Sequence, residues 1–443
     1  MSDMITTGAF IRLWRTVYNI FFPLFRGGVR LAALFLPKVK ASIDGRQKLF
    51  EVLESKLALL PKGKPRVLIH ASSVGEFEQA RPLIKRLREE SDCQIFVSFL
   101  SVSGFEARKN FSEAELVTYL PEDTSKNAER FFRLLAPDVM IVVRYDTWFN
   151  HLFAAKQRGA RLILIDAVLR DDAAYLKLIA KNFYRAVFGL FDMIFTVSER
   201  DRINFDAHFH LHAEAAGDTR FDQVVLRSQG TKMITHLRRH YEHAQVIVAG
   251  STWPEDETKL LEAIKDFGAS LIVVPHEVGA ANIRRLESLL KSHGRTSERI
   301  SSLPDEFGSD KILIVDQIGY LAELYALASV AYVGGGFGGN VHNVLEAAVH
   351  GVPVIYGPNI SKSVEASELY RAGGGVIVET ADDLRNALRI FLSDEPARIA
   401  SGDNAKNFVM RQTGATAKIF SFIQTSLSHT TVNTHQEKNH GRS

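Results

Sequence analysis

This chain has very little cysteine and no large net charge of either sign. Its 443 residues contain one cysteine, Cys93, which excludes a disulfide framework and any zinc or iron–sulfur site built on several thiolates. Cys93 precedes the apolar run 95–100, so we interpret it as a small buried hydrophobic residue and not as a nucleophile. The formal net charge of +3 gives no indication of a nucleic-acid partner.

A long uncharged hydrophobic run is also lacking at the N-terminus. Residues 10–37 are rich in Phe, Leu, Trp and Tyr, but arginines at positions 12, 15, 26 and 30 interrupt them. No uncharged run reaches the roughly 20 residues that a simple spanning helix needs. We therefore expect residues 1–45 to form a membrane-anchoring helical segment, broken at Pro23, that lies in the membrane interface. The alternatives are a soluble helical hairpin packed on the next domain and, less favoured, a signal peptide.

Short β-branched runs alternate with helical patterns along the rest of the chain. In the first half they begin near residues 66, 94, 138, 161 and 192, and in the second half near 245, 270, 311, 329 and 352. This alternation predicts an α/β protein with two doubly wound, Rossmann-like domains. We place these domains at 46–216 and 217–427 and expect the polar tail 428–443 to be disordered. Because such folds bind ligands at the carboxyl ends of their strands, the chemistry is expected in a cleft between the domains.

Two motifs of the first half directly follow predicted strands. In the sequence HASSVGEFEQ, Gly75 permits a tight turn and Glu76 begins the next helix. A carboxylate at that edge can take the proton from an acceptor hydroxyl, or it can merely stabilise the helix N-terminus, and spacing favours neither role. The sequence RYDTWFN ends another strand, where Arg144, Asp146 and Asn150 can bind sugar hydroxyls or a carboxylate.

The second half contains a small phosphate-binding motif and a glycine-rich loop. The sequence AGST at 249–252 supplies small, hydrogen-bonding residues after a strand, which is typical of phosphate capture but is a weak signal alone. The segment 332–359 has the order strand, glycine-rich loop, helix and strand, and it lacks the lysine of an ATP-hydrolysing P-loop. His342, Asn343 and Glu346 stand near the start of its helix, where Glu346 can accept the hydroxyls of a ribose. The alternative is that Asn343 and Glu346 only cap the helix.

In their order and over nearly the whole chain, these motifs resemble those of the Kdo transferases, a family of inverting glycosyltransferases with the GT-B architecture. The resemblance implies that Glu76 is the general base and assigns Asp146 to the catalytic site. GDTRFD, AGST, the Pro-His pair, DQIGYLAELY and VHNVLEAAVHGVPVIYGP resemble the family's other blocks. They imply the following donor-binding residues: Arg220, Ser251, Thr252, Pro275, His276, Gly319, Asn343 and Glu346.

Several positions depart from the family's pattern. Arg144 stands where a glutamate is common, and Asp146 is shorter than the second glutamate of that block. His276 replaces the arginine of a Pro-Arg pair, which leaves a weaker, titratable cation facing the donor. Tyr320 replaces another glutamate, and Arg220 stands where a lysine is usual. We interpret the chain as a divergent branch of the family and favour a variant acceptor over a changed donor.

The resemblance implies attack by a hydroxyl of a lipid A precursor on the anomeric carbon of CMP-Kdo, with CMP leaving and the configuration inverted. Arg220, His276 and backbone amides near Ser251 would stabilise the departing phosphate, and no Asp-x-Asp motif indicates a metal, so no cofactor is expected. Anchoring at the cytoplasmic face of the bacterial inner membrane would hold the enzyme at the surface that contains its acceptor. The rival functions are a UDP-sugar transferase or epimerase of the same fold, and a degenerate membrane-bound nucleotide- or lipid-binding protein.

Overall fold

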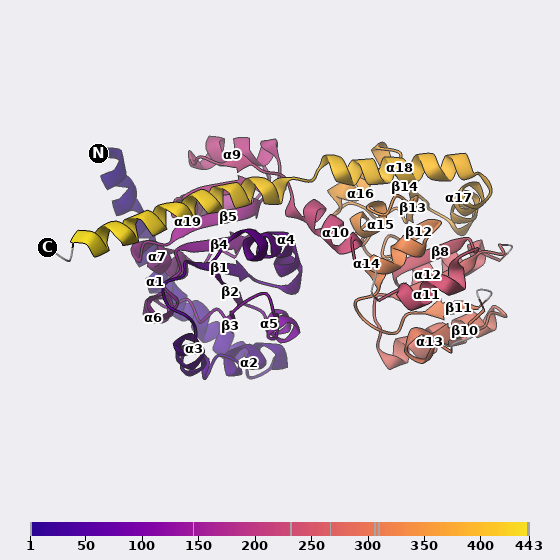
Figure 1. Cartoon of the computed structure of the whole chain (residues 1–443), viewed down its shortest axis with the longest axis horizontal. Helices are drawn as coiled ribbons and strands as arrows, with labels where there is room; N and C mark the ends of the chain where they lie inside the picture. Colours follow the sequence, from indigo (N-terminus) through magenta and orange to yellow (C-terminus); the bar gives the residue numbers. More distant parts are fainter. Residues whose placement is uncertain are drawn as a thin grey trace. The chain divides into compact units, whose positions relative to one another are not determined.

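The computed structural model describes the backbone of residues 2–144, 146–230, 233–265, 267–304, 307–308 and 311–440, and their side chains except those of 2–7, 178–179 and 429–440. The chain forms two compact units, drawn in Figure 1 and described separately here. Unit 1 comprises Met1–Gln223 and Gly414–Ser443, and unit 2 comprises Val224–Thr413. This division falls at 223/224, seven residues after the expected boundary at 216/217.

Unit 1 is built on a parallel sheet that has seven strands among the described residues, in the order β3-β2-β1-β4-β5-β6-β7. The apolar runs predicted as strands form its centre, where they are buried on both faces. The strands are Arg66–Ala71 (β1), Gln94–Phe99 (β2), Leu116–Tyr119 (β3), Val139–Val143 (β4), Arg161–Ala167 (β5), Met193–Thr196 (β6) and Glu214–Ala215 (β7). The strand order reverses between β1 and β4, and doubly wound sheets bind ligands at such a reversal.

Helices flank the sheet of unit 1 (Figure 1). The buried apolar side chains of this unit form two clusters. Alternate residues of each central strand enter different clusters, as the twofold periodicity of a strand requires. Several helices begin at a hydroxyl that accepts a hydrogen bond from an amide of the first turn, namely those of Ser73, Ser101, Thr124 and Ser198. The helices are Pro37–Asp44 (α2), Leu49–Ala58 (α3), Val74–Glu90 (α4), Val102–Arg108 (α5), Ser125–Leu135 (α6), Phe149–Gln157 (α7), Leu178–Phe188 (α8) and Glu199–Phe209 (α9), with a 3₁₀ turn at Ala174–Leu176. Helix α10 (Thr219–Ser228) begins in unit 1 and ends in unit 2.

The N-terminal helix α1 (Ser2–Ala32) runs without interruption through Pro23, so the predicted break there is wrong. Pro23 is exposed, and water can therefore satisfy the backbone carbonyl that loses its donor. No single helix of the described chain is long and apolar enough to cross a membrane. Residues Gly8–Ala32 and helix α2, which are bent by 117° relative to each other, meet the length and composition limits only as a pair.

One side of α1 packs on the core of unit 1 through aromatic side chains. The ring centroids of Trp14 and Tyr18 lie 6.2 and 5.9 Å from that of Phe183 on α8. The Tyr18 hydroxyl donates to Asp123 Oδ2 at 2.8 Å, and burial together with this carboxylate raises the pKa of Tyr18. These contacts agree with the alternative in which the N-terminal helices pack on the domain.

Asn150, near the start of α7, fixes α1 to unit 1 through polar contacts. Its side chain is fully buried, and its Oδ1 accepts from Arg15 Nε at 3.0 Å. Its Nδ2 donates to Asn19 Oδ1 and to the Asp123 carbonyl, each at 2.8 Å. All the hydrogen-bonding groups of this amide are thus used inside the protein. The expectation that Asn150 binds a sugar is therefore wrong.

The other side of α1 and the turn that leads to α2 expose large apolar side chains. Leu24, Leu34 and Phe35 are 73%, 76% and 77% exposed. We call this surface the N-terminal apolar surface, and it consists of Leu13, Ile20, Phe21, Leu24, Phe25, Leu31, Leu34, Phe35 and Leu36. A soluble protein rarely leaves so many large apolar side chains together in water.

The C-terminal helix α19 (Ala415–His440) belongs to unit 1, although we had placed the chain up to residue 427 in the second domain. Ile419, Phe420, Ile423 and Leu427 recur at helical spacing and are buried in the cluster that also contains α4. The helix continues over most of the tail that was expected to be disordered, because no Gly or Pro stands between residues 415 and 440. Residues 441–443 lie outside the described part.

Unit 2 contains a second parallel sheet of seven strands within its described segments, in the order β10-β11-β9-β8-β12-β13-β14. The strands are Val246–Thr252 (β8), Ser270–Pro275 (β9), Ser297–Arg299 (β10), Ile312–Ile314 (β11), Val330–Val333 (β12), Val354–Tyr356 (β13) and Gly375–Ile377 (β14). Here the order reverses between β8 and β12. The predicted α/β class with two doubly wound domains is confirmed.

The helices of unit 2 connect these strands in the manner of a doubly wound fold. They are Thr235–Tyr241 (α11), Pro254–Ala263 (α12), Ala280–Ser292 (α13), Leu321–Leu324 (α14), Leu345–Ala348 (α15), Val364–Arg371 (α16), Ala381–Ser393 (α17) and Glu395–Arg411 (α18), with 3₁₀ turns at Ile300–Ser302 and Tyr325–Leu327.

Candidate active site

Glu76 stands on the first turn of α4, directly after β1 and at the reversal of strand order in unit 1. Its Oε2 accepts from the Ser72 amide at 2.5 Å, while its own amide donates to Ser73 Oγ at 3.4 Å. The carboxylate therefore does stabilise the start of the helix, as the alternative reading of the sequence required. Burial is the main cause that raises the pKa of Glu76, and the negative charge of Asp146 adds to it. A raised pKa suits a general base, because it brings proton affinity closer to neutral pH.

Asp146 lies on the other side of the same reversal, after β4, and is tied to β1 through a histidine. Asp146 Oδ2 is 2.7 Å from Nε2 of His70, a residue of β1 that is fully buried. The other ring nitrogen of His70 is 2.9 Å from Ser98 Oγ in β2. These contacts place the two acids assigned to catalysis on the carboxyl ends of adjacent strands. They also fix Asp146 close enough to influence Glu76.

Arg144 connects this acid pair to the predicted donor-binding residue Arg220. Its φ is +62°, and its Nε donates to Gln79 Oε1 of α4 at 2.9 Å. Its Nη2 is 3.9 Å from Asp218 Oδ2. Arg220 donates to both oxygens of the same carboxylate, with Nη2 2.6 Å from Oδ2. A phosphate that binds Arg220 would compete with Asp218 for this guanidinium.

Sequence reasoning missed Asp166, a fully buried carboxylate in β5 with φ of +53°. It accepts from the amide of Thr219 at 2.9 Å and from its hydroxyl at 2.5 Å, so it holds the start of α10, which carries Arg220. Burial, followed by the nearby charge of Asp218, raises the pKa of Asp166 to about 7. The sequence did offer one signal, because Asp166 is an acid directly after the apolar run 161–165. Its partner Thr219 lies 53 residues later, so the sequence did not reveal the contact.

A cavity of about 580 Å³ opens beside Glu76 in unit 1. It is lined mainly by apolar atoms, and Lys38 is the charged residue of its lining. Ser72, whose amide binds Glu76, is also part of the wall. The cavity is lined by Lys38, Val39, Ala41 and Ser42 of α2, by Ser72, and by 100–103.

In unit 2, Ser251, Thr252 and Pro275 end the adjacent strands β8 and β9. Ser251 has a φ of +53°. A Cβ atom added at Gly334 would lie 2.5 Å from the Ser251 carbonyl oxygen, so the backbone after β12 lies against the end of β8. Thr252 is buried, and its hydroxyl donates to Glu257 Oε1 at 3.1 Å. The Thr252 hydroxyl therefore faces the interior, whereas Ser251 is partly exposed.

The glycine-rich loop after β12 is shaped by a buried acid of α12. Asp256 Oδ2 accepts from the amides of Gly335 and Trp253, both at 2.8 Å. Gly335 has a φ of +92°, and a side chain there would lie 2.4 Å from the Asn340 carbonyl. Only glycine fits this turn, which brings backbone from β8 and β12 together at the reversal of strand order.

The remaining candidate residues Asn343, Glu346 and Gly319 have unequal roles. Asn343 Oδ1 accepts from the Leu345 amide at 3.1 Å, so the capping alternative applies to Asn343. Glu346 takes no part in that cap and instead pairs with Arg227, with its Oε1 2.9 Å from Nη1. Gly319 is exposed and has a φ of +105°, which a side chain would strain.

His276 follows β9 and is exposed, with its ring stacked on that of His342 at a centroid distance of 4.4 Å. Tyr320 directly precedes α14 and is partly exposed. Within the described ranges, no group of three or more His, Cys, Asp or Glu side chains is arranged to hold a metal ion.

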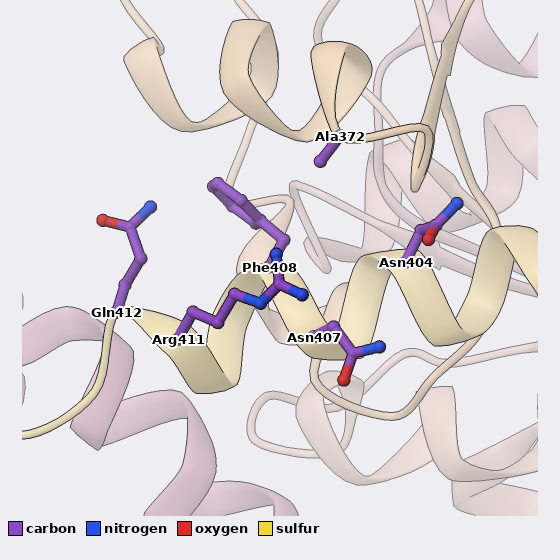
Figure 2. A pocket seen from close by; sticks show the side chains of 6 residues that line it. All are labelled: Ala372, Asn404, Asn407, Phe408, Arg411 and Gln412. Atoms are coloured by element: carbon purple, nitrogen blue, oxygen red, sulfur yellow. The ribbon is translucent and has the colours of Figure 1, made fainter.

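A second cavity of unit 2 lies apart from these residues (Figure 2). Its volume is about 300 Å³, and most of its wall comes from one side of α18. It is lined by Ala372, Asn404, Asn407, Phe408, Arg411 and Gln412, and no predicted site residue is among them. We therefore do not assign it to the active site.

Comparison with known proteins finds similarity to one enzyme family. A family model described as 3-Deoxy-D-manno-octulosonic-acid transferase (kdotransferase) matches residues 47–223, and its end coincides with the end of the first segment of unit 1. The 3-deoxy-D-manno-octulosonic acid transferase of Chlamydophila psittaci is 28% identical over 362 residues, which cover 77% of this chain and 80% of that protein. By these matches the chain is similar to the Kdo transferases. The Kdo transferase of Rickettsia felis is 26% identical over 335 residues and covers 74% of this chain and 71% of its own length.

The fold of this chain is also found among solved structures. A putative UDP-N-acetylglucosamine 2-epimerase from Listeria monocytogenes aligns with a TM-score of 0.57 at 14% identity. The alignment covers 83% of this chain and 98% of that protein. At such low identity the likeness shows the fold alone, and it confirms the predicted GT-B class.

Proposed function

We propose that the chain is an inverting glycosyltransferase that transfers Kdo from CMP-Kdo to a lipid A precursor. The observation that carries the proposal is the place of Glu76, at the reversal of strand order and with a raised pKa, in a chain that is similar to the Kdo transferases. The acceptor hydroxyl attacks the anomeric carbon as its proton passes to Glu76. The bond from that carbon to the phosphate oxygen breaks, and CMP leaves with the electron pair.

The cavity beside Glu76 supports an acceptor that carries both polar and apolar parts. Its apolar wall suits acyl chains, and Lys38 suits a phosphate or carboxylate. Ser72 links the wall to the base through its amide. On this basis the acceptor binds unit 1 in our proposal, with its attacking hydroxyl next to Glu76.

The donor is assigned to unit 2, at the loops after β8, β9 and β12. Backbone that approaches closely at Ser251 and Gly335 suits a phosphate and its sugars. In our proposal the departing charge is stabilised by protein cations such as His276 and not by a metal ion. Glu346 can bind a ribose only if its ion pair with Arg227 opens.

The test is to incubate the full chain with CMP-Kdo and a tetra-acyl lipid A precursor and to count the sugars added by mass spectrometry. We expect one or more increments of the mass of Kdo. Turnover of UDP-sugars in place of CMP-Kdo would instead support the rival transferase or epimerase. Binding of CMP-Kdo and acceptor without any increment would support a degenerate binding protein.

We also propose that the chain lies on the cytoplasmic face of the bacterial inner membrane. The N-terminal apolar surface supports this, because its exposed Leu and Phe side chains can enter the acyl region. Lys38 and Lys40 stand next to it and are exposed, so they can meet anionic head groups. Co-sedimentation with vesicles of anionic phospholipid tests this. Leu24→Glu together with Phe35→Glu should abolish binding, whereas the same substitutions at exposed Leu59 and Ile203 should not.

A further inference from the structure

The guanidinium of Arg46 joins three segments at the carboxyl ends of the strands of unit 1. Arg46 stands between α2 and α3 and is half-buried. Its Nε donates to the Leu120 carbonyl at 2.7 Å, after β3, and its Nη2 donates to the Leu100 carbonyl at 2.5 Å, after β2. Its Nη1 donates to the carbonyl and the hydroxyl of Ser42 in α2, at 2.7 and 2.8 Å. Each of its three nitrogens thus serves a different segment.

Two of these segments are walls of the cavity beside Glu76. Ser42 belongs to the wall that α2 forms, and Leu100 begins the wall that 100–103 form. Arg46 is not itself part of the lining, so it holds the two walls together from outside the cavity. A planar guanidinium is suited to this, because its donors point in fixed directions from three nitrogens.

The wall at 100–103 is connected directly to the proposed base. The Ser101 amide donates to the Ser72 carbonyl at 3.0 Å, and the Ser72 amide donates to Glu76 Oε2. A displacement of this wall would therefore alter the space next to the base, in which the acceptor lies in our proposal.

Arg46 makes these contacts without an acidic partner. No carboxylate of the described residues forms an ion pair with it, and its charge faces carbonyl oxygens and the Tyr119 ring, whose centroid is 4.8 Å from Cζ. Burial is the main cause that lowers the pKa of Arg46, and the charge of Asp146 is among those that oppose this shift. A buried charge is costly even when it is paired. The place of this arginine is therefore better explained by what it holds than by a gain in stability.

We propose that Arg46 is a positioning residue for the acceptor: it sets the separation of the two cavity walls and thereby the affinity for the lipid that receives the sugar. The inference rests on the proposed function and adds to it a residue that does not touch the substrate. Lys38 would contact the acceptor directly, whereas Arg46 acts through Ser42 and Leu100.

The test is Arg46→Lys in the full chain, with transfer of Kdo measured against the concentration of the tetra-acyl lipid A precursor and, separately, of CMP-Kdo. A lysine keeps the positive charge, but its compact ammonium cannot span three segments. We therefore expect the KM for the acceptor to rise about tenfold or more, the effect of losing a hydrogen bond to a charged group. The KM for CMP-Kdo should change by less than about twofold and kcat by less than about threefold, because Glu76 keeps its contact with Ser72. An unchanged KM for the acceptor would overturn the inference.

Arg66→Lys is the matched control. Arg66 also donates to a carbonyl, that of Leu135 at 2.9 Å, and lies over an aromatic ring, but it stands at the start of β1, at the opposite end from the cavity. Both variants should lower the melting temperature, and only Arg46→Lys should raise the KM for the acceptor. An equal rise in the two variants would reduce Arg46 to a structural role and overturn the inference.

Ser42→Ala is a milder variant that does not depend on the folding of Arg46→Lys. It removes the hydroxyl that accepts from Nη1 of Arg46 and should raise the KM for the acceptor by about two- to tenfold. In the Arg46→Lys background the same substitution should have a smaller effect, because the two residues act through one contact. Additive effects would give Ser42 and Arg46 separate roles and would overturn the inference.

The failures of the two proposals are distinguishable through equilibrium binding of the same lipid precursor to the full chain. If the wild type binds this acceptor but transfers no sugar, the proposed activity fails, and weaker binding by Arg46→Lys would still support the inference. Transfer by the wild type with equal acceptor affinity in both proteins overturns the inference alone. Absence of acceptor binding to the wild type overturns both.

Discussion

Replacement of Glu76 by glutamine is the perturbation that bears most directly on the proposed chemistry. The amide side chain of Glu76→Gln would still present an oxygen to the Ser72 amide, which donates to the carboxylate at 2.5 Å in the wild type. The helix start should therefore be retained, and unit 1 should keep its stability. What the substitution removes is the ability to take a proton from the acceptor.

General-base catalysis contributes about 10²- to 10⁴-fold to a rate, so we expect Glu76→Gln to lower kcat by that factor. This corresponds to about 3 to 5 kcal/mol of transition-state stabilisation. The assay is transfer of Kdo at saturating CMP-Kdo and acceptor. CMP binding, measured separately, should change by less than about twofold, because Glu76 belongs to unit 1 and the proposed donor site to unit 2.

The pH profile gives a second measure of the same residue. A general base acts when it is ionised, so kcat should fall as pH drops through the raised pKa of Glu76. This fall should begin at a higher pH than for an ordinary glutamate. Asp146→Asn removes a charge that raises this pKa and should move the acidic limb to lower pH. Glu78→Gln is the matched control, because Glu78 is on the same helix but pairs with Arg108 at 2.7 Å. Wild-type turnover in Glu76→Gln would refute the assignment of the base.

Three further predictions concern the framework. Ile423→Ala should destabilise unit 1 by about 2 to 5 kcal/mol in chemical denaturation, because it empties a fully buried site, while exposed Gln424→Ala should change it by less than about 0.5 kcal/mol. Asn150→Ala should speed tryptic cleavage of α1, because it removes the buried hydrogen-bond partner of Arg15 at a cost of about 1 to 3 kcal/mol. An unchanged rate of cleavage would contradict the role of Asn150 in holding α1 on unit 1. Asp166 keeps its proton in the folded state up to about pH 7 but loses it near pH 4 in the unfolded state. The free energy of unfolding should therefore fall as pH rises between these two values. The melting temperature of Asp166→Asn should lack this fall.

Much of the fold could be predicted because its central strands are short, β-branched and buried on both faces. The runs at 66–71 and 94–99 show this directly. The edge strands β3, β7, β10 and β14 were missed, because each has only two to four residues. The return of α19 to unit 1 could not be predicted, since the stripe Ile419, Phe420, Ile423 reveals an apolar face but not the surface that covers it.

The position of a candidate residue was predictable where it directly follows an apolar strand, as for Glu76 after β1 and His276 after β9. A role was not predictable where it depends on a partner far away in sequence. Glu346 is near the glycine loop as expected, yet the Arg227 that pairs with it comes from a helix 119 residues earlier. Asp166 and Asn150 show the same limit, because only folding brings their partners to them.

Backbone strain bears on the choice between an enzyme and a degenerate binding protein. Arg144, Asp166 and Ser251 are non-glycine residues with positive φ, and each stands at the carboxyl end of a central strand. Such a conformation costs about 1 to 3 kcal/mol per residue and persists only where surroundings impose it. At Arg144 the surroundings are the contact to Gln79, and at Asp166 they are the two contacts to Thr219. Glycine at these positions would relieve the strain but lose these side-chain contacts, so a chain that keeps both strain and contacts is better explained by catalysis than by passive binding.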